Sequence, residues 1–193
     1  DVINFFSNEK SGIYLISLNY KVTTILLRYI TNLLKPMSLF VKISLPLFII
    51  DQISKLLVLY NFDLGDEKSI IPNFFNLVRV HNTGIAFGKF NDATYSNIIF
   101  SFVAIFALIF IIVLWKKNKF PGKVNTYAIV FLVPGILGNL VDRLWHGYVV
   151  DFLDFYINNS HWPSFNVADS CICISAGLLF IGAFKADEEL KEK

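Results

Sequence analysis

The sequence predicts a mainly α-helical integral membrane protein, with four transmembrane helices and a small β element in an outer loop. Two observations carry this prediction. Of the 193 residues, 55% are hydrophobic and only 17% are charged, which gives a mean hydropathy of +0.57. The apolar residues are also gathered into segments of roughly 20 residues, the length that a helix needs to cross a bilayer core.

The charge and cysteine content exclude several classes of function. The formal net charge is only +2, and the basic residues are scattered along the chain. A nucleic-acid partner would require a basic stripe interleaved with aromatic residues, so we exclude that class. Cys171 and Cys173 lie two residues apart in an apolar run, which points them to different faces of a helix. We expect two free apolar side chains rather than a disulfide or a metal pair.

Residues 1–36 are expected to be an N-terminal extension of uncertain origin. Their apolar run is broken by Lys21 and Arg28, which is more typical of an interfacial or extraneous segment than of a span. The run also lacks the small-residue cleavage site of a secretory signal peptide. The single methionine, Met37, directly precedes the first good span. We therefore expect residues 37–193 to form the working four-helix domain.

The first span is expected at residues 39–60, and it carries two charges. Asp51 and Lys55 stand at positions i and i+4, which places their side chains together on one helix face in the favourable order, acid before base. An ion pair of this kind lets both charges enter the membrane zone. We interpret the two residues as a structural ion pair rather than as catalytic groups.

A polar stretch, residues 61–93, follows the first span. Its run NLVRV alternates and contains β-branched residues, a pattern typical of a short strand. Gly84 permits a tight turn beside Asn82. A small sheet on the membrane surface fits this pattern. Three further spans are expected at residues 94–115, 124–141 and 165–184.

The distribution of lysine and arginine predicts the orientation. The connection KKNKFPGK carries four lysines within eight residues, whereas the loop after Arg143 contains no lysine or arginine before the fourth span. The positive-inside rule places the lysine-rich connection, and with it both termini, in the cytoplasm. Residues 61–93 and 144–164 are then outer loops, and Asp151 and Asp169 lie near the outer interface.

The motifs that are absent leave carboxylate chemistry as the main option. The chain has no HExxH pair, no GxSxG turn and no glycine-rich phosphate loop. Two antiparallel helices can bring Asp151 and Asp169 face to face, so that one carboxylate activates water while the other, protonated, polarises a carbonyl. This chemistry needs neither metal nor cofactor. Each aspartate is equally suited to cap a helix, and the residues alone leave both roles open.

Five motifs occur in one order relative to the four expected spans. They are DQISK at 51–55, HNTGIAFG at 81–88, GNLVDR at 138–143, VVDF at 149–152 and FNVADS at 165–170. Together they closely resemble the lipoprotein signal peptidases, the signal peptidase II family of bacterial membrane aspartyl proteases. The resemblance covers residues 38–185. It implies four spans, a small extracytoplasmic β-cradle, and cleavage of prolipoproteins just before a cysteine that already carries diacylglycerol.

The resemblance also assigns roles to residues. It implies that Asp151 and Asp169 are the catalytic pair of a peptidase domain at 37–193, and that Asp51 and Lys55 are a supporting ion pair. The residues that it implies for binding the substrate backbone or orienting the pair are Asn82, Gly84, Asn139, Arg143 and Asn166. Two further acids do not match the pair: we expect Asp142 to be paired with a neighbouring base and Asp154 to be a solvated loop residue.

The implied partners are lipid-modified prolipoproteins and membrane lipids, and we expect a monomer in the bacterial cytoplasmic (inner) membrane, with the active site toward its outer face. Two alternative functions also use buried acidic residues. A small channel or transporter subunit would use Asp51, Asp151 and Asp169 to line a polar path. A lipid-transferring enzyme would use acidic residues to bind a divalent metal, but the sequence lacks the repeated aspartate spacing of such a site.

Overall fold

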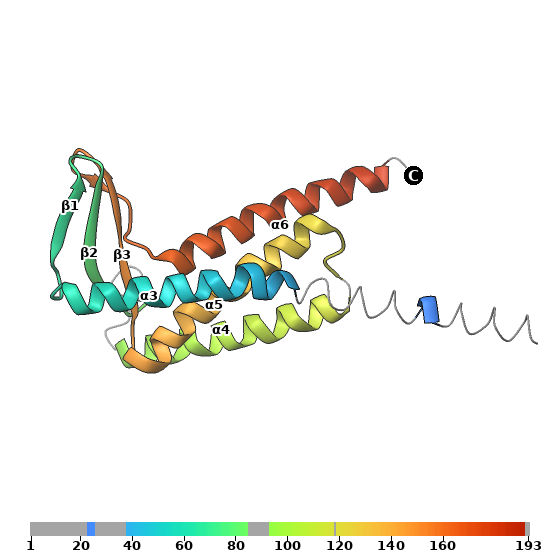
Figure 1. The fold of residues 1–193 in the computed structure, drawn as a ribbon, viewed down its shortest axis with the longest axis horizontal. Coiled ribbons are helices and arrows are strands. Elements are labelled where there is room, and N and C mark those ends of the chain that lie inside the picture. Colours follow the sequence, from blue (N-terminus) through green and yellow to red (C-terminus); the bar gives the residue numbers. More distant parts are fainter. Residues whose placement is uncertain (1–22, 26–37, 85–92, 118, 192–193) are drawn as a thin grey trace, which may run out of the picture. The chain divides into compact units, whose positions relative to one another are not determined.

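Four long helices and one small antiparallel sheet make up the computed structural model (Figure 1). It describes residues 23–25, 38–84, 93–117 and 119–191, without the side chains of 93, 94 and 185–191. The helices are α3 (Leu45–Asn61), α4 (Ala93–Lys116), α5 (Lys123–His146) and α6 (Val167–Lys191), and a π-helical turn, Phe40–Ser44, leads into α3. The strands are β1 (Glu67–Ile71), β2 (Phe75–Asn82), β3 (Val149–Ile157) and β4 (Ser160–His161), in the sheet order β1-β2-β3-β4.

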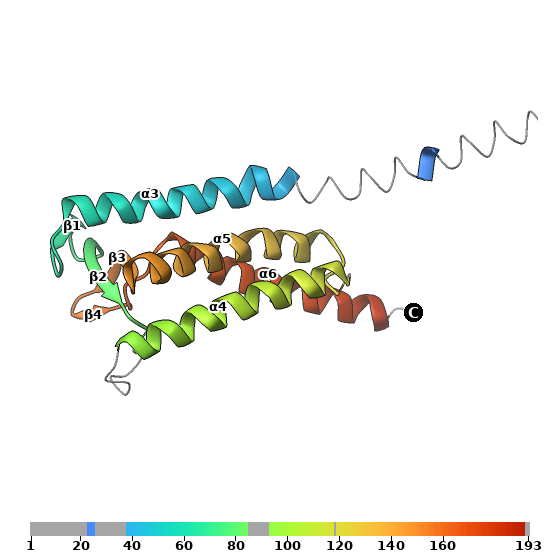
Figure 2. The same ribbon diagram turned by 90° about the horizontal axis from the view of Figure 1, so that it is seen from below.

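The helices run side by side, and the sheet lies at one end of them (Figures 1 and 2). Helices α3 and α5 end at the sheet, whereas α4 and α6 begin there. All four are long and apolar enough to cross a membrane. Large apolar side chains such as Phe102 and Phe106 on α4 are exposed, as lipid-facing groups are, because hydrocarbon rather than water surrounds them. The predicted fold class is confirmed.

Helix α5 extends to His146, beyond the expected end at residue 141. Gly147 terminates it in a left-handed conformation, with φ 81°, and donates its N–H to the carbonyl oxygen of Arg143 at 3.1 Å. The chain enters β3 two residues later. The prediction of a loop at 144–164 was therefore wrong, because the run VVDFLDFYI has the β-branched and aromatic composition of a buried strand.

A β-bulge lies next to the third residue of β3. Leu77 on β2 pairs with Leu153, and Val80 pairs with Asp151, so β2 advances three residues while β3 advances two. Such an extra residue bends the strand and re-aims the side chains that follow it. Asn82 is among the residues that follow the bulge on β2.

An apolar cluster fixes the sheet to the helices. It contains Val58 from the end of α3, and Val150 and Phe152 from β3. Residues 41–193 form one compact unit that contains all of these elements. The expected N-terminal extension, residues 1–36, lies almost wholly outside the described residues.

Candidate active site

Asp151 is the third residue of β3, and only 2% of its surface is exposed. Two side-chain amides hold its carboxylate. Asn82 Nδ2 donates to Oδ2 at 2.9 Å from the neighbouring strand, and Asn166 Nδ2 donates to Oδ1 at 2.8 Å from the residue just before α6. No lysine, arginine or histidine of the described residues forms an ion pair with this carboxylate.

Asp169 lies in the first turn of α6, where it forms a reciprocal cap with Asn166. The Asp169 N–H donates to Asn166 Oδ1 at 2.9 Å, and the Asn166 N–H donates to Asp169 Oδ2 at 3.2 Å, which is the geometry of a capping box. The other carboxylate oxygen, Oδ1, accepts a hydrogen bond from Asn139 Nδ2 at 2.7 Å. Capping therefore uses one oxygen of Asp169 and leaves the other in a side-chain network.

Asn166 joins the two aspartates. Its side chain bonds Asp151, its backbone bonds Asp169, and its Nδ2 also lies 3.2 Å from Asn139 Oδ1. Asn166 is fully buried, so these bonds hold it in one orientation. The structure thus brings together five of the residues expected from the sequence: Asp151, Asp169, Asn82, Asn139 and Asn166.

A buried ion-pair cluster of Asp51, Lys55 and Asp142 adjoins this network. Lys55 Nζ lies 2.9 Å from Asp51 Oδ2 and 2.9 Å from Asp142 Oδ2, and it donates to Asn139 Oδ1 at 3.1 Å. The three charged residues are only 1–3% exposed. A Cβ at Gly138 would overlap the Asp51 carboxylate, so this position of α5 requires glycine. The base that pairs with Asp142 is thus Lys55, from another helix.

The ion-pair cluster also holds the backbone next to each aspartate of the network. Asp51 Oδ1 accepts a hydrogen bond from the Ala168 N–H at 2.8 Å, and Asp142 Oδ2 accepts one from the Val150 N–H at 3.1 Å. Each donor directly precedes one of the two network aspartates in the sequence. The cluster therefore helps to set the position of both carboxylates without bonding either of them.

Arg143 and Gly84 lie beside the network. The Arg143 guanidinium carbon is 5.4 Å from the centre of the Phe100 ring, and Nη1 donates to the carbonyl oxygen of Asn139 at 3.4 Å. Gly84 has φ 81° and donates its N–H to Asn82 Oδ1 at 2.8 Å, and a Cβ there would overlap the Phe100 ring. Within the described residues Arg143 hydrogen-bonds neither aspartate. The second half of the HNTGIAFG motif, residues 85–88, lies outside them.

Asp154 is buried on β3, with 4% of its surface exposed, so the prediction of a solvated loop residue was wrong. Its carboxylate accepts a hydrogen bond from Asn76 Nδ2 at 3.1 Å and lies 3.0 Å from His161 Nδ1. The strand that replaces the expected loop is what removes this residue from solvent. Because residues three apart on a strand face opposite sides, Asp154 points away from Asp151.

Burial raises the pKa of Asp151 from the ordinary 3.8 to about 7. Loss of water is the largest cause, because it disfavours the charged form of the carboxyl. The hydrogen bond from Asn82 opposes this rise, the negative charge of Asp169 adds to it, and Asn166 and Lys55 oppose it. Near neutral pH, Asp151 therefore holds a proton for part of the time beside a second carboxyl group.

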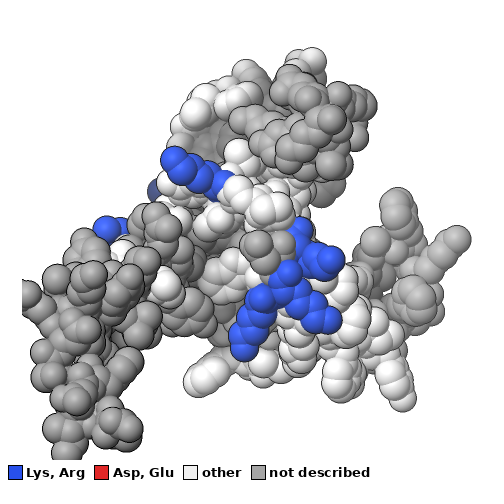
Figure 3. Space-filling view, turned by 90° about the vertical axis from the view of Figure 1, so that its right-hand side faces the viewer, with Lys and Arg blue, Asp and Glu red and all other residues white. Residues whose placement is uncertain are grey.

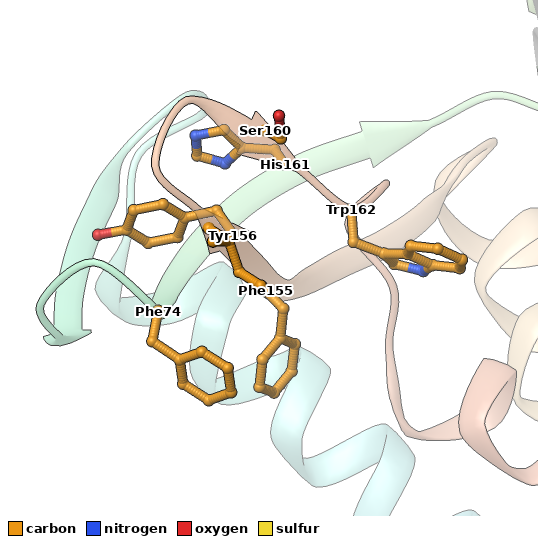
Figure 4. A pocket seen from close by; sticks show the side chains of 7 residues that line it. Phe74, Phe155, Tyr156, Ser160, His161 and Trp162 are labelled. Atoms are coloured by element: carbon orange, nitrogen blue, oxygen red, sulfur yellow. The ribbon is translucent and has the colours of Figure 1, made fainter.

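An aromatic hollow of about 380 Å³ lies on the sheet (Figure 4). Figure 4 shows the rings of Phe74 and Phe155 extending to the same side of the strands. Phe155 is four residues beyond Asp151 on β3, and side chains an even number of residues apart share a face. Phe155 therefore lies on the same face of β3 as Asp151, whereas His161 contacts Asp154 on the opposite face. Its lining residues are Phe74, Phe155, Tyr156, Ile157, Ser160, His161 and Trp162.

Asn97 on α4 is a site residue that the sequence reasoning missed. Its Nδ2 donates to the carbonyl oxygen of Arg143 at 3.1 Å, and its Oδ1 is buried without a partner among the described residues. The available signal was an amide side chain inside a span with no charged residue, since polar groups at membrane depth face the bundle. No sequence signal distinguishes Phe100, the ring against Arg143, from the other phenylalanines.

Comparison with known proteins gives concordant matches. The family model described as signal peptidase (SPase) II matches residues 43–185. The lipoprotein signal peptidase of Shewanella sediminis is 45% identical over 149 residues, 76% of this chain and 83% of that protein. The lipoprotein signal peptidase of Alteromonas mediterranea is 44% identical over 156 residues, 80% of this chain and 85% of that protein. A solved bacterial membrane enzyme matches with a TM-score of 0.70 at 32% identity, over 80% of this chain and 92% of that one.

Proposed function

The chain belongs to the signal peptidase II family, and from that premise we propose that Asp151 and Asp169 are the catalytic pair of an aspartic endopeptidase. Its reaction is removal of the signal peptide from prolipoproteins, which is the activity named for its relatives. One observation carries the assignment of the pair. Two carboxyl groups from different elements share Asn166, and the pKa of one of them is raised to about 7.

The two aspartates divide the proton chemistry. Asp169 is partly exposed and accepts two N–H donors, and we assign it the role of the base that takes a proton from water. The water oxygen then attacks the scissile carbonyl carbon, while protonated Asp151 donates its proton to the carbonyl oxygen. Asp169 then gives its proton to the amide nitrogen and the C–N bond breaks. Asp151 takes a proton back from a hydroxyl of the tetrahedral intermediate as the carboxylic acid product forms, which returns the pair to its starting state.

The neighbouring groups support this reaction in two ways. Asn82 and Asn166 fix the Asp151 carboxyl, so no reorganisation is needed when charge develops. Arg143 Nε and Asn97 Oδ1 are a buried donor and a buried acceptor without partners among the described residues. Because unpaired buried groups are costly, we assign them to the backbone of the bound substrate.

The membrane setting suits a lipid-bearing substrate. The hollow lined by Phe74 and Phe155 provides an apolar surface on the strand that carries Asp151, for the acyl chains or the signal helix. We assign the site to the outer face and both termini to the cytoplasm, on the positive-inside rule. The peptidase domain is assigned to residues 37–193, acting as a monomer. No observation favours a channel or transporter subunit.

The test is cleavage of a lipobox peptide with a diacylglyceryl cysteine by purified variants in detergent. Asp151→Asn and Asp169→Asn are each expected to lower kcat by roughly 10²- to 10⁴-fold, the contribution of general acid–base catalysis. Asp154→Asn is the matched control, because it removes a buried carboxylate from the same strand outside the network. Cleavage at the normal rate by either catalytic variant would overturn the assignment. Activity is expected to survive EDTA, and a loss that added metal restores would favour a metal enzyme.

A further inference from the structure

Four exposed lysines lie at the end of the helices away from the sheet. They occupy the connection between α4 and α5 and its two helix ends, and we call this segment the lysine loop. Figure 3 shows lysine and arginine side chains gathered on this end, with no acidic side chain visible on its described surface. The members of the lysine loop are Lys116, Lys117, Lys119 and Lys123.

The lysine loop is held at the depth of the lipid headgroups. One membrane span ends at Lys116 and the next begins at Lys123, so the ammonium groups lie where the hydrocarbon ends. The connection is tight: the Lys119 N–H donates to the Leu114 carbonyl oxygen at 3.0 Å, and Gly122 has φ 89°. The four charges are therefore confined to a small area, and their long side chains can extend into the headgroup layer.

The segments directly before and after the lysine loop contain no acidic residue. Residues 93–141 contain no aspartate or glutamate. None of the four lysines forms an ion pair with a carboxylate of the described residues. Four like charges closer together than a Debye length repel one another and attract anions. Four lysines clustered in this way at headgroup depth are suited to bind the phosphodiester groups of lipids.

We propose that the lysine loop is a binding site for the headgroups of anionic phospholipids. It retains anionic lipid around the ends of α4 and α5, at the opposite end of the helices from the catalytic pair, and so is independent of the prolipoprotein substrate. The acidic residues 187–189 near the C-terminus are an alternative source of negative charge that could neutralise the lysine loop in place of lipid. Neutralisation by that stretch would leave no preference for anionic lipid.

The experiment uses Trp115, which directly precedes the loop, as a fluorescent reporter. The full chain carrying Trp145→Phe and Trp162→Phe is reconstituted into phosphatidylcholine vesicles that contain either brominated phosphatidylglycerol or brominated phosphatidylcholine. Bromine on the acyl chains quenches tryptophan on contact. We expect phosphatidylglycerol to quench Trp115 more strongly than phosphatidylcholine, and this preference to weaken as salt is added.

Lysine substitutions in the lysine loop and at an exposed control position test the proposal. Each Lys→Gln change in the loop is expected to reduce the preference for phosphatidylglycerol by up to roughly five-fold, the factor typical of one lysine at an anionic surface. Lys68→Gln, an exposed lysine on β1, removes the same charge from the sheet and is expected to change nothing. Equal quenching by the two lipids, or a preference that survives loss of all four lysines, would overturn the proposal.

Discussion

Two groups of buried carboxylates adjoin one another in this molecule, and they are stabilised in different ways. Asp51 and Asp142 share the cation of Lys55, whereas Asp151 and Asp169 are held mainly by the neutral amides of asparagines. A cation balances the charge of the carboxylates that it contacts, while neutral amides orient a carboxyl group without balancing its charge. We therefore interpret the first group as one that positions the backbone, and we propose that the second exchanges protons with the substrate.

The largest effect is expected from removal of the cation that Asp51 and Asp142 share. Lys55→Met leaves Asp51 and Asp142 buried without a compensating cation, which typically costs about 3–5 kcal/mol of unfolding free energy. The variant is expected to unfold at a much lower temperature than the parent in detergent, followed by tryptophan fluorescence. Lys68→Met, at an exposed position, is expected to change stability by no more than about 0.5 kcal/mol. If Lys55→Met unfolded at the same temperature as the parent, this result would contradict the structural role of the ion-pair cluster.

A second prediction concerns how stability depends on pH. Because the pKa of Asp151 is raised from 3.8 to about 7, the native state holds a proton that the unfolded chain releases. Stability is therefore expected to fall as pH rises from about 4 to about 7, and this contribution levels off above about 7. Asp151→Asn removes the titrating group and is expected to flatten the slope. Unfolding temperatures measured across this pH range test the prediction. If the unfolding temperature of Asp151→Asn depended on pH as strongly as that of the parent, another group would be responsible for the pH dependence.

A third prediction sharpens the role of the amides. If protonated Asp151 is the acid, activity falls as pH rises through about 7. The hydrogen bond from Asn82 lowers the pKa of Asp151, so Asn82→Ala is expected to move this fall to higher pH and to reduce kcat about ten-fold. The control is Asn125→Ala, whose amide bonds the Pro121 carbonyl oxygen at the far end of the helices. A pH profile that moves equally in both variants would argue against direct support of Asp151.

The smallest effect is expected at Asp154. Asp154→Asn keeps an oxygen for Asn76 and changes only the contact with His161, whose side chain is half exposed, so this contact contributes little. We expect a loss of about 1 kcal/mol in stability and activity within about two-fold of the parent. A complete loss of cleavage by a folded variant would show that a buried carboxylate outside the asparagine network is also required.

The features that sequence could predict are local or strongly periodic. The four spans follow from apolar length alone, and the Asp51–Lys55 contact follows from i,i+4 spacing on a helix. Motif resemblance indicates the candidate pair, because spacing leaves capping and catalysis open. The structure shows why spacing was insufficient: Asp169 makes capping bonds and also belongs to the asparagine network.

The features that sequence could not predict depend on contacts between distant elements. The burial of Asp154 depends on β3 pairing with β2, a long-range contact that the composition of β3 alone does not reveal. The third charge of the ion-pair cluster comes from Asp142 on α5, which no spacing rule connects with Lys55 on α3. Contacts of this kind follow from the packing of the helices, where small residues such as Gly138 let side chains approach.

The contrast between the two groups of carboxylates is tested most directly by infrared titration of the purified protein in detergent. A protonated carboxyl group absorbs at a frequency distinct from that of a carboxylate, so its loss can be followed as pH rises. We predict a carboxyl band that disappears with a midpoint near pH 7 and is absent from Asp151→Asn but retained in Asp154→Asn. A band that persists in Asp151→Asn, or no carboxyl titration near neutral pH, would contradict the assignment of Asp151 as the proton-holding member of the pair.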